Sequence, residues 1–238
     1  MLYTYKALAL FLAYPEEDTQ ALMPEAFKAL QSEGRLNAPL LRALGKLADR
    51  LSHSDLYDLQ EAYVHLFDRT RSLSLNLYEH VHGESRDRGQ AMAALKSLYE
   101  AAGLELTAQE LPDYLPVFLE FLSLQTPEKA STFLADAAHV LEAIAERLKK
   151  RESDYRAVFG ALVHLSGVEA GQEAVAALLQ EPEEDPDDLE ALDRLWEETA
   201  VTFGPGEAGC PKAEAMVAAM ATPSTAAPTG AVRPSART

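Results

Sequence analysis

Apolar residues recur at helical spacing along most of the chain, and the alternation expected of strands is nearly absent. One clear example is the set Leu40, Leu44, Leu47 and Leu51, which falls on a single helical face. Such a pattern lets each helix bury one face against its neighbours. We therefore expect an all-α protein built as a single helical bundle.

Residues that start and stop helices stand where this pattern changes. Gly34, Gly103 and Gly167 each stand where a helical pattern stops and are expected to end helices. Thr126 and Pro127 form a strong start, with a cap and a proline at the first position. The expected helices cover about residues 3–13, a stretch ending at 32, one beginning at 39, one capped by Ser54 or Asp55, then 86–102, 114–122, 127–150, one capped by Ser153 and reaching 164, and 172–179.

The character of the chain changes twice toward its end. Residues 1–166 carry the regular helical pattern, and residues 167–203 form an acidic segment with short helices in which ten of the eighteen residues 181–198 are acidic. Residues 204–238 are rich in Pro, Gly, Ala and Thr and offer little apolar surface. We expect a helical core, a loosely attached acidic segment and a disordered tail.

Charge narrows the range of partners. The chain carries 38 acidic and 21 basic side chains, a formal net charge of -17. Such a field repels phosphate backbones and anionic lipid surfaces, so nucleic acid is not expected as a partner and a basic partner is favoured. A single cysteine, Cys210, fits a reducing compartment, and no run approaches the length of a membrane span. We expect a cytoplasmic protein without direct membrane insertion.

Sequence motifs of catalysis are missing: there is no Gly-rich phosphate loop, nucleophile elbow or H-E-x-x-H pattern. The nearest approach to a metal site is His80, His82 and Glu84. In an extended segment both imidazoles share a face, whereas on a helix they point about 200° apart. A helical metal-dependent enzyme centred on His80 and His82 is one alternative. The favoured one is that these histidines hold a loop or contact a partner, with no cofactor.

Residues 68–89 interrupt the helical pattern with a dense run of charged and polar groups, which we interpret as a long ordered connection. Two charged clusters flank it: Asp68, Arg69 and Arg71 before it, and Arg86, Asp87 and Arg88 at its end. These clusters could pair with each other and fix the connection, or they could form a charged site for a partner. The sequence leaves both alternatives open.

Residues 110–123 combine two prolines with an aromatic stripe of Tyr114, Phe118 and Phe121 at helical spacing. Asp113 can cap this helix. An aromatic stripe is usually core, and we favour that interpretation. Its position beside the two prolines also suits the wall of a groove that binds a helix.

Several of these stretches resemble one protein family. LYEHVHGESRDRGQAM (residues 77–92) and ELPDYLPVFLEFLS (110–123) closely resemble two motifs of the NarJ-type chaperones, the delta subunit of respiratory nitrate reductase. YVHLFDRTRSLSL (63–75), RLKKRESDYRAVF (147–159) and LWEETAVTFGPGEAGC (195–210) are similar to the same family. The resemblance extends from about residue 1 to Cys210.

The resemblance implies a TorD-like, all-helical chaperone of a molybdenum enzyme that is not itself an enzyme. Its family members bind the apo catalytic subunit of nitrate reductase, chiefly at the N-terminal segment. They keep that subunit competent for molybdenum cofactor insertion, delay its docking onto the membrane anchor, and are absent from the finished enzyme. The alternative is a stable structural subunit. A monomer is expected, with a dimer as the other possibility.

One departure from the wider TorD-like group is Tyr114, which stands where a histidine is common. We expect the client to bind as an amphipathic helix against the 78–88 connection and the helix over 113–122. The expected client-binding residues are Tyr78, Glu79, His80, His82, Glu84, Arg86, Asp87, Arg88, Asp113, Tyr114, Phe118 and Phe121.

A truncation tests the expected disorder of the tail. Removing the residues after Gly204 should leave the thermal midpoint unchanged to within about 2 °C, because this segment has little apolar surface to bury. Differential scanning calorimetry of both forms measures the difference. A large drop on truncation would reveal an element of the tail that docks on the core.

Overall fold

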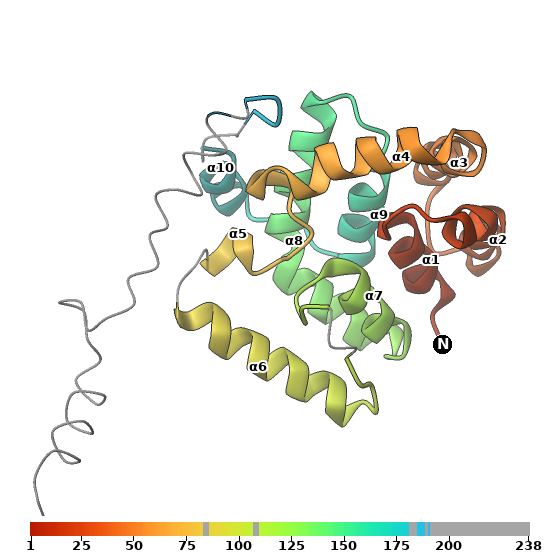
Figure 1. Cartoon of the computed structure of the whole chain (residues 1–238). Coiled ribbons are helices and arrows are strands. Elements are labelled where there is room, and N and C mark those ends of the chain that lie inside the picture. Colours follow the sequence, from red (N-terminus) through yellow and green to blue (C-terminus); the bar gives the residue numbers. More distant parts are fainter. Residues whose placement is uncertain (83–85, 107–109, 181–184, 189, 191–238) are drawn as a thin grey trace, which may run out of the picture. The chain divides into compact units, whose positions relative to one another are not determined.

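Helices account for nearly all regular structure in the computed structural model (Figure 1). The structure describes residues 1–82, 86–106, 110–180, 185–188 and 190. They lie in the first of two units, Met1–Asp193; no residue of the second, Arg194–Thr238, is described. The elements are α1 (Tyr3–Leu12), α2 (Glu17–Glu33), α3 (Ala38–His53), α4 (Leu56–Tyr63), the π-helical turn η1 (Val64–Asp68), the 3-10 turn η2 (Arg71–Leu73), α5 (Glu79–His82), α6 (Arg86–Ala101), α7 (Leu115–Ser123), α8 (Pro127–Lys150), α9 (Arg156–Ser166) and α10 (Gln172–Gln180).

The prediction of an all-α fold is confirmed over these residues. Most helix ends also fall where their sequence signals stand. Gly34, Gly103 and Gly167 have φ values of 66°, 80° and 71°, the left-handed conformation that ends a helix at little cost for glycine. The side chains of Asp55 and Thr126 cap α4 and α8 as predicted.

Two predicted caps are wrong. Asp113 does not cap α7, because Tyr114 occupies the N-cap position and the Asp113 carboxylate accepts a hydrogen bond from the Tyr78 N–H instead. Ser153 does not cap α9, which starts two residues later, with Tyr155 at the N-cap. The expected disorder of residues 204–238 falls outside the described residues.

The core is built mainly from two helix packings, α8 on α9 and α1 on α7 and α2. α8 packs along α9, while α1 lies between α2 and α7 (Figure 1). α1 is apolar on almost every side because neighbours surround it, and its Tyr5, Leu8 and Leu12 have no exposed surface. This arrangement places α7 at one edge of the core, with α1 and α2 on one side and α5, α6 and α8 on the other.

A buried arginine of α8, Arg147, connects this helix to η2 and α10. Arg147 is only 1% exposed, and its guanidinium donates to the carbonyl oxygens of Ser72 in η2 and Leu178 in α10. Val175 and Leu178 of α10 are buried as well. The weak helix predicted over 172–179 is therefore present and packs on α8.

The described residues of the acidic segment also contact the core. His65 Nε2 lies 3.2 Å from Asp187 Oδ1, and Arg69 donates to the Pro186 carbonyl at 3.2 Å. His65 belongs to the π-helical turn η1, and Arg69 directly follows it. The predicted division of the chain at residue 166 stays a prediction.

Replacing Arg147 tests how strongly this contact holds η2 and α10. Arg147→Met should lower the free energy of unfolding by about 2–4 kcal/mol, since two buried carbonyl groups lose their donor. Lys149→Met on the exposed side of the same helix is the matched control and should change it by less than about 0.5 kcal/mol. Urea denaturation measures both values. Equal stabilities for the two variants would contradict the proposed contribution of Arg147.

Candidate interaction site around helix α7

The chain that precedes α5 is held against the start of α7 by backbone hydrogen bonds. The Leu115 N–H donates to the Leu75 carbonyl at 2.8 Å, and the Leu77 N–H donates to the Asp113 carbonyl at 3.0 Å. Asn76 and Tyr114 form an isolated antiparallel bridge between them. The described part of the predicted long connection is thus fixed to α7, and the two stretches that the sequence singled out lie side by side.

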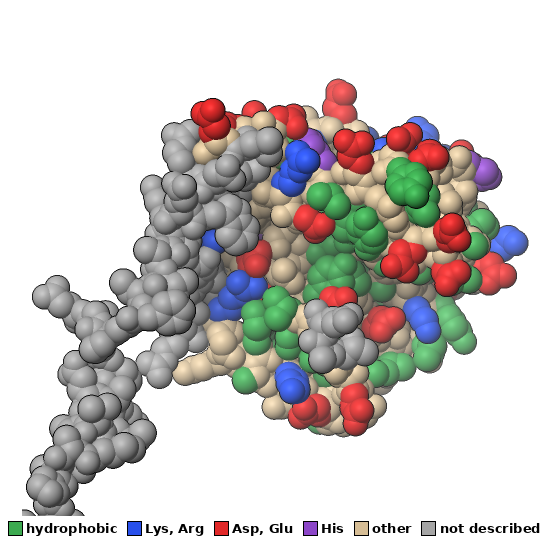
Figure 2. All heavy atoms as spheres, in the orientation of Figure 1, with side chains coloured by type: hydrophobic (Ala, Val, Ile, Leu, Met, Phe, Trp, Pro, Cys, Tyr) green, Lys and Arg blue, Asp and Glu red, His purple; other side chains and the backbone are tan. Residues whose placement is uncertain are grey.

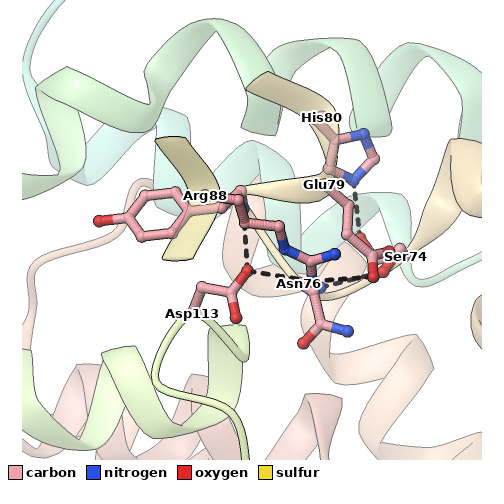
Figure 3. Close-up of polar contacts among 7 residues, drawn as sticks. Ser74, Asn76, Glu79, His80, Arg88 and Asp113 are labelled. Carbon is pink, nitrogen blue, oxygen red and sulfur yellow. Dashed lines mark hydrogen bonds and ion pairs between the residues drawn. The ribbon is translucent and has the colours of Figure 1, made fainter. Parts of the chain in front are cut away.

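A small ionic network reinforces this junction (Figure 3). The Asp113 carboxylate is fully buried and accepts the Tyr78 N–H at 3.1 Å. Arg88 of α6 lies 3.8 Å from the same carboxylate oxygen and 3.0 Å from Glu79 of α5. Burial raises the pKa of Asp113 above its usual range, while the Tyr78 N–H and Arg88 act in the opposite direction.

His80 stabilises the segment between η2 and α5 by a hydrogen bond. Its Nε2 lies 2.8 Å from the Ser74 carbonyl oxygen, and because a carbonyl only accepts, this nitrogen must carry the proton (Figure 3). His80 and His82 lie on α5, so they lack the extended backbone that a shared metal would need. No group of metal-ligating side chains occurs among the residues that the structure describes. The side chain of His82 and all of Glu84 lie outside them.

Two arginines of the charged clusters have partners outside the opposite cluster. Arg88 bonds Glu79 and Asp113, whereas Arg69 of the upstream cluster bonds the Pro186 carbonyl. Arg88 therefore does fix the connection, through partners that the sequence analysis did not anticipate. The side chains of Arg86 and Asp87 are not among those described.

The aromatic stripe of α7 lies mostly in the core. Phe121 is 1% exposed, with ring centroids 5.0 Å from Tyr99 and 5.4 Å from Phe133. Phe118 is 6% exposed and borders a groove. Phe121 is thus a core residue that supports α7, whereas Phe118 has one edge at a surface that a partner can reach.

Two apolar grooves flank α7. The first, which we call the Tyr78 groove, has a volume of about 370 Å³ and runs between α5, α6, α7 and α8. Its lining includes Tyr78, Val81, Leu98, Asp113, Phe118 and His139. The second, the Tyr114 groove, has a volume of about 540 Å³ and runs between α1, α2 and α7. Its lining includes Tyr3, Leu10, Leu22, Tyr114, Val117 and Glu120.

The Tyr114 groove is the part of the site that the sequence analysis missed. The predicted site contained Tyr114 but no residue of α1 or α2. Tyr3 of α1 and Leu22 of α2 are 57% and 48% exposed, although each helix buries other apolar residues. In Figure 2, apolar and acidic side chains lie side by side over this region. Periodicity alone does not distinguish an apolar residue at a groove from one in the core.

The side chain of Tyr114, which lines this groove, belongs to a chain of hydrogen bonds. The Tyr63 hydroxyl donates to the Leu12 carbonyl at 2.9 Å, and the Tyr63 and Tyr114 hydroxyl oxygens are 3.1 Å apart. Burial raises the pKa of both hydroxyls, so both remain protonated at neutral pH. Tyr63 also packs against the rings of Tyr14, Phe67 and Tyr155.

Comparison with known proteins places this architecture in a family. Residues 33–161 match the family model described as nitrate reductase delta subunit. The chain belongs to that family. It is 41% identical over 192 residues to NarJ of Escherichia coli K12, described as a nitrate reductase molybdenum cofactor assembly chaperone, a match that covers 81% of each chain. NarW of the same strain is 39% identical over 198 residues, covering 83% of this chain and 82% of NarW.

The fold has also been seen in a solved structure. A protein from Archaeoglobus fulgidus, described as a redox enzyme maturation protein, superposes with a TM-score of 0.52 at 24% identity. The superposition covers 71% of this chain and 94% of the other. None of the described helices is both long enough and apolar enough to cross a bilayer. The family resemblance inferred from the sequence motifs is therefore confirmed, together with the helical fold that it implied.

Substitutions at Asp113 test its contribution to the junction. Asp113→Ala should lower the free energy of unfolding by about 2–4 kcal/mol, because the buried Tyr78 N–H and the Arg88 guanidinium each lose a partner. Asp113→Asn keeps an acceptor for the N–H and should cost less. Asp136→Asn, an exposed carboxylate lining the same groove, is the control.

The pH dependence of these variants separates charge from hydrogen bonding. A raised pKa means that the native state holds the Asp113 proton more tightly than the unfolded chain. The stability of the wild type relative to Asp113→Asn should therefore fall as the pH rises above about 4, the ordinary pKa of an aspartate. Urea titrations between pH 4 and neutrality measure the difference. A relative stability that rises over this range would refute the assignment.

Proposed function

We propose that this chain is an assembly chaperone for respiratory nitrate reductase that acts in the cytoplasm. It binds the N-terminal segment of the apo catalytic subunit, keeps that subunit competent for molybdenum cofactor insertion, and delays its docking onto the membrane anchor. It is not an enzyme, and it leaves before the finished enzyme is complete. The strongest support is the 41% identity to NarJ over four-fifths of both chains.

The site around α7 supports a peptide-binding role. Two apolar grooves border one short helix, and exposed apolar grooves of this kind are typical of surfaces that receive the apolar face of an amphipathic helix. The surface predicted from the sequence, formed by residues 78–88 and 113–122, includes α7 and part of the lining of both grooves, and we propose that the client binds in one of them. Within this surface, Tyr78, Tyr114 and Phe118 line the grooves, while Glu79, His80, Arg88 and Asp113 hold the two segments together.

Charge supports the choice of client segment. A net charge of -17 attracts a basic peptide over a range set by the ionic strength. Such attraction raises the association rate, while apolar contacts in a groove govern dissociation. A chaperone must release its client, so an encounter driven by charge and a contact area of modest size suit this role.

A binding titration tests the proposal. We expect a peptide from the N-terminus of the catalytic subunit to bind the full-length chain, and a scrambled peptide of equal charge to bind at least about tenfold more weakly, because apolar anchors must fall on one helical face. The association rate should drop severalfold between about 0.05 and 0.3 M salt, with little change in the dissociation rate. Stopped-flow fluorescence measures both rates.

A second measurement separates a chaperone from a structural subunit. When the catalytic subunit is produced with and without this chain, its molybdenum content should be higher with the chain present. The purified mature membrane enzyme should then lack it. Finding the chain in the mature enzyme at one copy per catalytic subunit would favour a structural role.

A further inference from the structure

The Tyr114 groove has a chemical character that the Tyr78 groove lacks. Its walls are apolar, with Leu10 and Ala7 from α1, Ala26 from α2 and Val117 from α7. Tyr3 and Leu22 stand at its edges with about half of their surface exposed. Exposed apolar residues that gather along one groove are typical of a surface that another chain covers.

The charges around this groove are predominantly negative. In the lining that the structure describes, Glu25, Glu110 and Glu120 stand against one amine, Lys6. Among the described residues, none of these three carboxylates has a cationic group within 4 Å. In the Tyr78 groove, the Asp113 carboxylate already faces Arg88 and accepts a backbone N–H, which leaves Asp136 as the other carboxylate of the lining that the structure describes. The Tyr114 groove therefore offers negative charge that is not yet neutralised.

The hydrogen bonds at Tyr114 add a directional preference. A carbonyl oxygen only accepts, so the single proton of Tyr63 is used on Leu12. The contact between the two hydroxyls then requires Tyr114 to donate its proton to Tyr63. With that proton committed, the Tyr114 oxygen retains acceptor capacity only. A ligand at this position must bring a donor.

We propose that the Tyr114 groove is where the N-terminal segment of the client binds, as a basic amphipathic helix. Its apolar face lies on α1 and α7, and a lysine or arginine donates to the Tyr114 oxygen between Glu110 and Glu120. This inference rests on the proposed function. It adds which side of α7 binds the client and which kind of client side chain is recognised there. Lysine and arginine carry hydrogen-bond donors and no acceptor, which matches the unused acceptor capacity of the Tyr114 oxygen.

The match also explains what the groove rejects. An acidic or acceptor-only side chain would meet three carboxylates and an acceptor oxygen, with Lys6 as the one favourable contact. Like charges and an unpaired acceptor in a partly dry groove both oppose binding. The groove is therefore selective for the charge of the segment as well as for its apolar face.

Affinity measurements on paired variants test this assignment. At about 0.05 M salt, Glu120→Lys should weaken binding of the N-terminal peptide about tenfold or more, while Glu61→Lys, an exposed site on α4, should change it by about twofold at most. Tyr114→Phe should weaken it about three- to tenfold, and Tyr57→Phe, whose ring is 80% exposed outside both grooves, should not. Isothermal titration calorimetry measures each affinity.

A modified peptide isolates the hydroxyl contact. When the lysines and arginines of the peptide are replaced by norleucine, wild-type affinity should fall, and Tyr114→Phe should then cause no further loss. Tyr114→Phe leaves the Tyr63 bond to Leu12 intact, so circular dichroism should show an unchanged fold. If Tyr114→Phe weakens binding of the modified and unmodified peptides equally, the Tyr114 hydroxyl does not accept a hydrogen bond from a basic side chain of the peptide.

Variants of the other groove distinguish this inference from the proposed function. Val81→Asp alters an exposed residue of the Tyr78 groove and should leave the affinity within about twofold. If Val81→Asp abolishes binding while the Tyr114-groove variants bind normally, the client uses the Tyr78 groove; the inference is then overturned and the proposed function stands. If the wild type binds no N-terminal peptide at all, both are overturned.

Discussion

Asp113 accepts the backbone N–H of Tyr78 from a position with no solvent exposure, and this contact determines much of what surrounds it. The same residue receives the Leu77 N–H on its carbonyl, and its carboxylate faces Arg88 of α6. A buried carboxylate is costly unless hydrogen bonds and a cation compensate it. Satisfying that requirement brings the 74–78 segment, the start of α6 and the start of α7 together, and so it shapes the Tyr78 groove.

Tyr114, the next residue, belongs to the other side of α7. Its hydroxyl joins a chain of hydrogen bonds through Tyr63 to the end of α1, and its ring lines the groove between α1, α2 and α7. Two consecutive residues therefore anchor α7 to different parts of the molecule. A helix fixed in this way at its start is a rigid wall, and a rigid wall reduces the ordering cost of binding a peptide.

The distribution of charge explains how an apolar groove can remain accessible without causing aggregation. The grooves hold exposed apolar side chains, which by themselves favour self-association. A strongly negative molecule repels its own copies and attracts a basic segment. In the proposed chaperone the same carboxylates thus serve solubility and selection, while the apolar floor supplies the contact that persists once the encounter has formed.

The sequence by itself determined the longer helices, most of their ends and the family. Helix ends depend on hydrogen bonds between residues a few positions apart. The roles of Gly34, Asp55 and Thr126 can therefore be predicted from the neighbouring sequence alone. The sequence also predicted a site over 78–88 and 113–122, but not how these two stretches meet. Asp113 looks like a cap because its competitor, the Tyr78 N–H, lies 35 residues away. The Tyr114 groove likewise combines residues from α1, α2 and α7, and the proton of Tyr114 is assigned by a carbonyl in α1. Only tertiary packing decided which apolar residues stay exposed, because burial depends on neighbours that are distant along the chain.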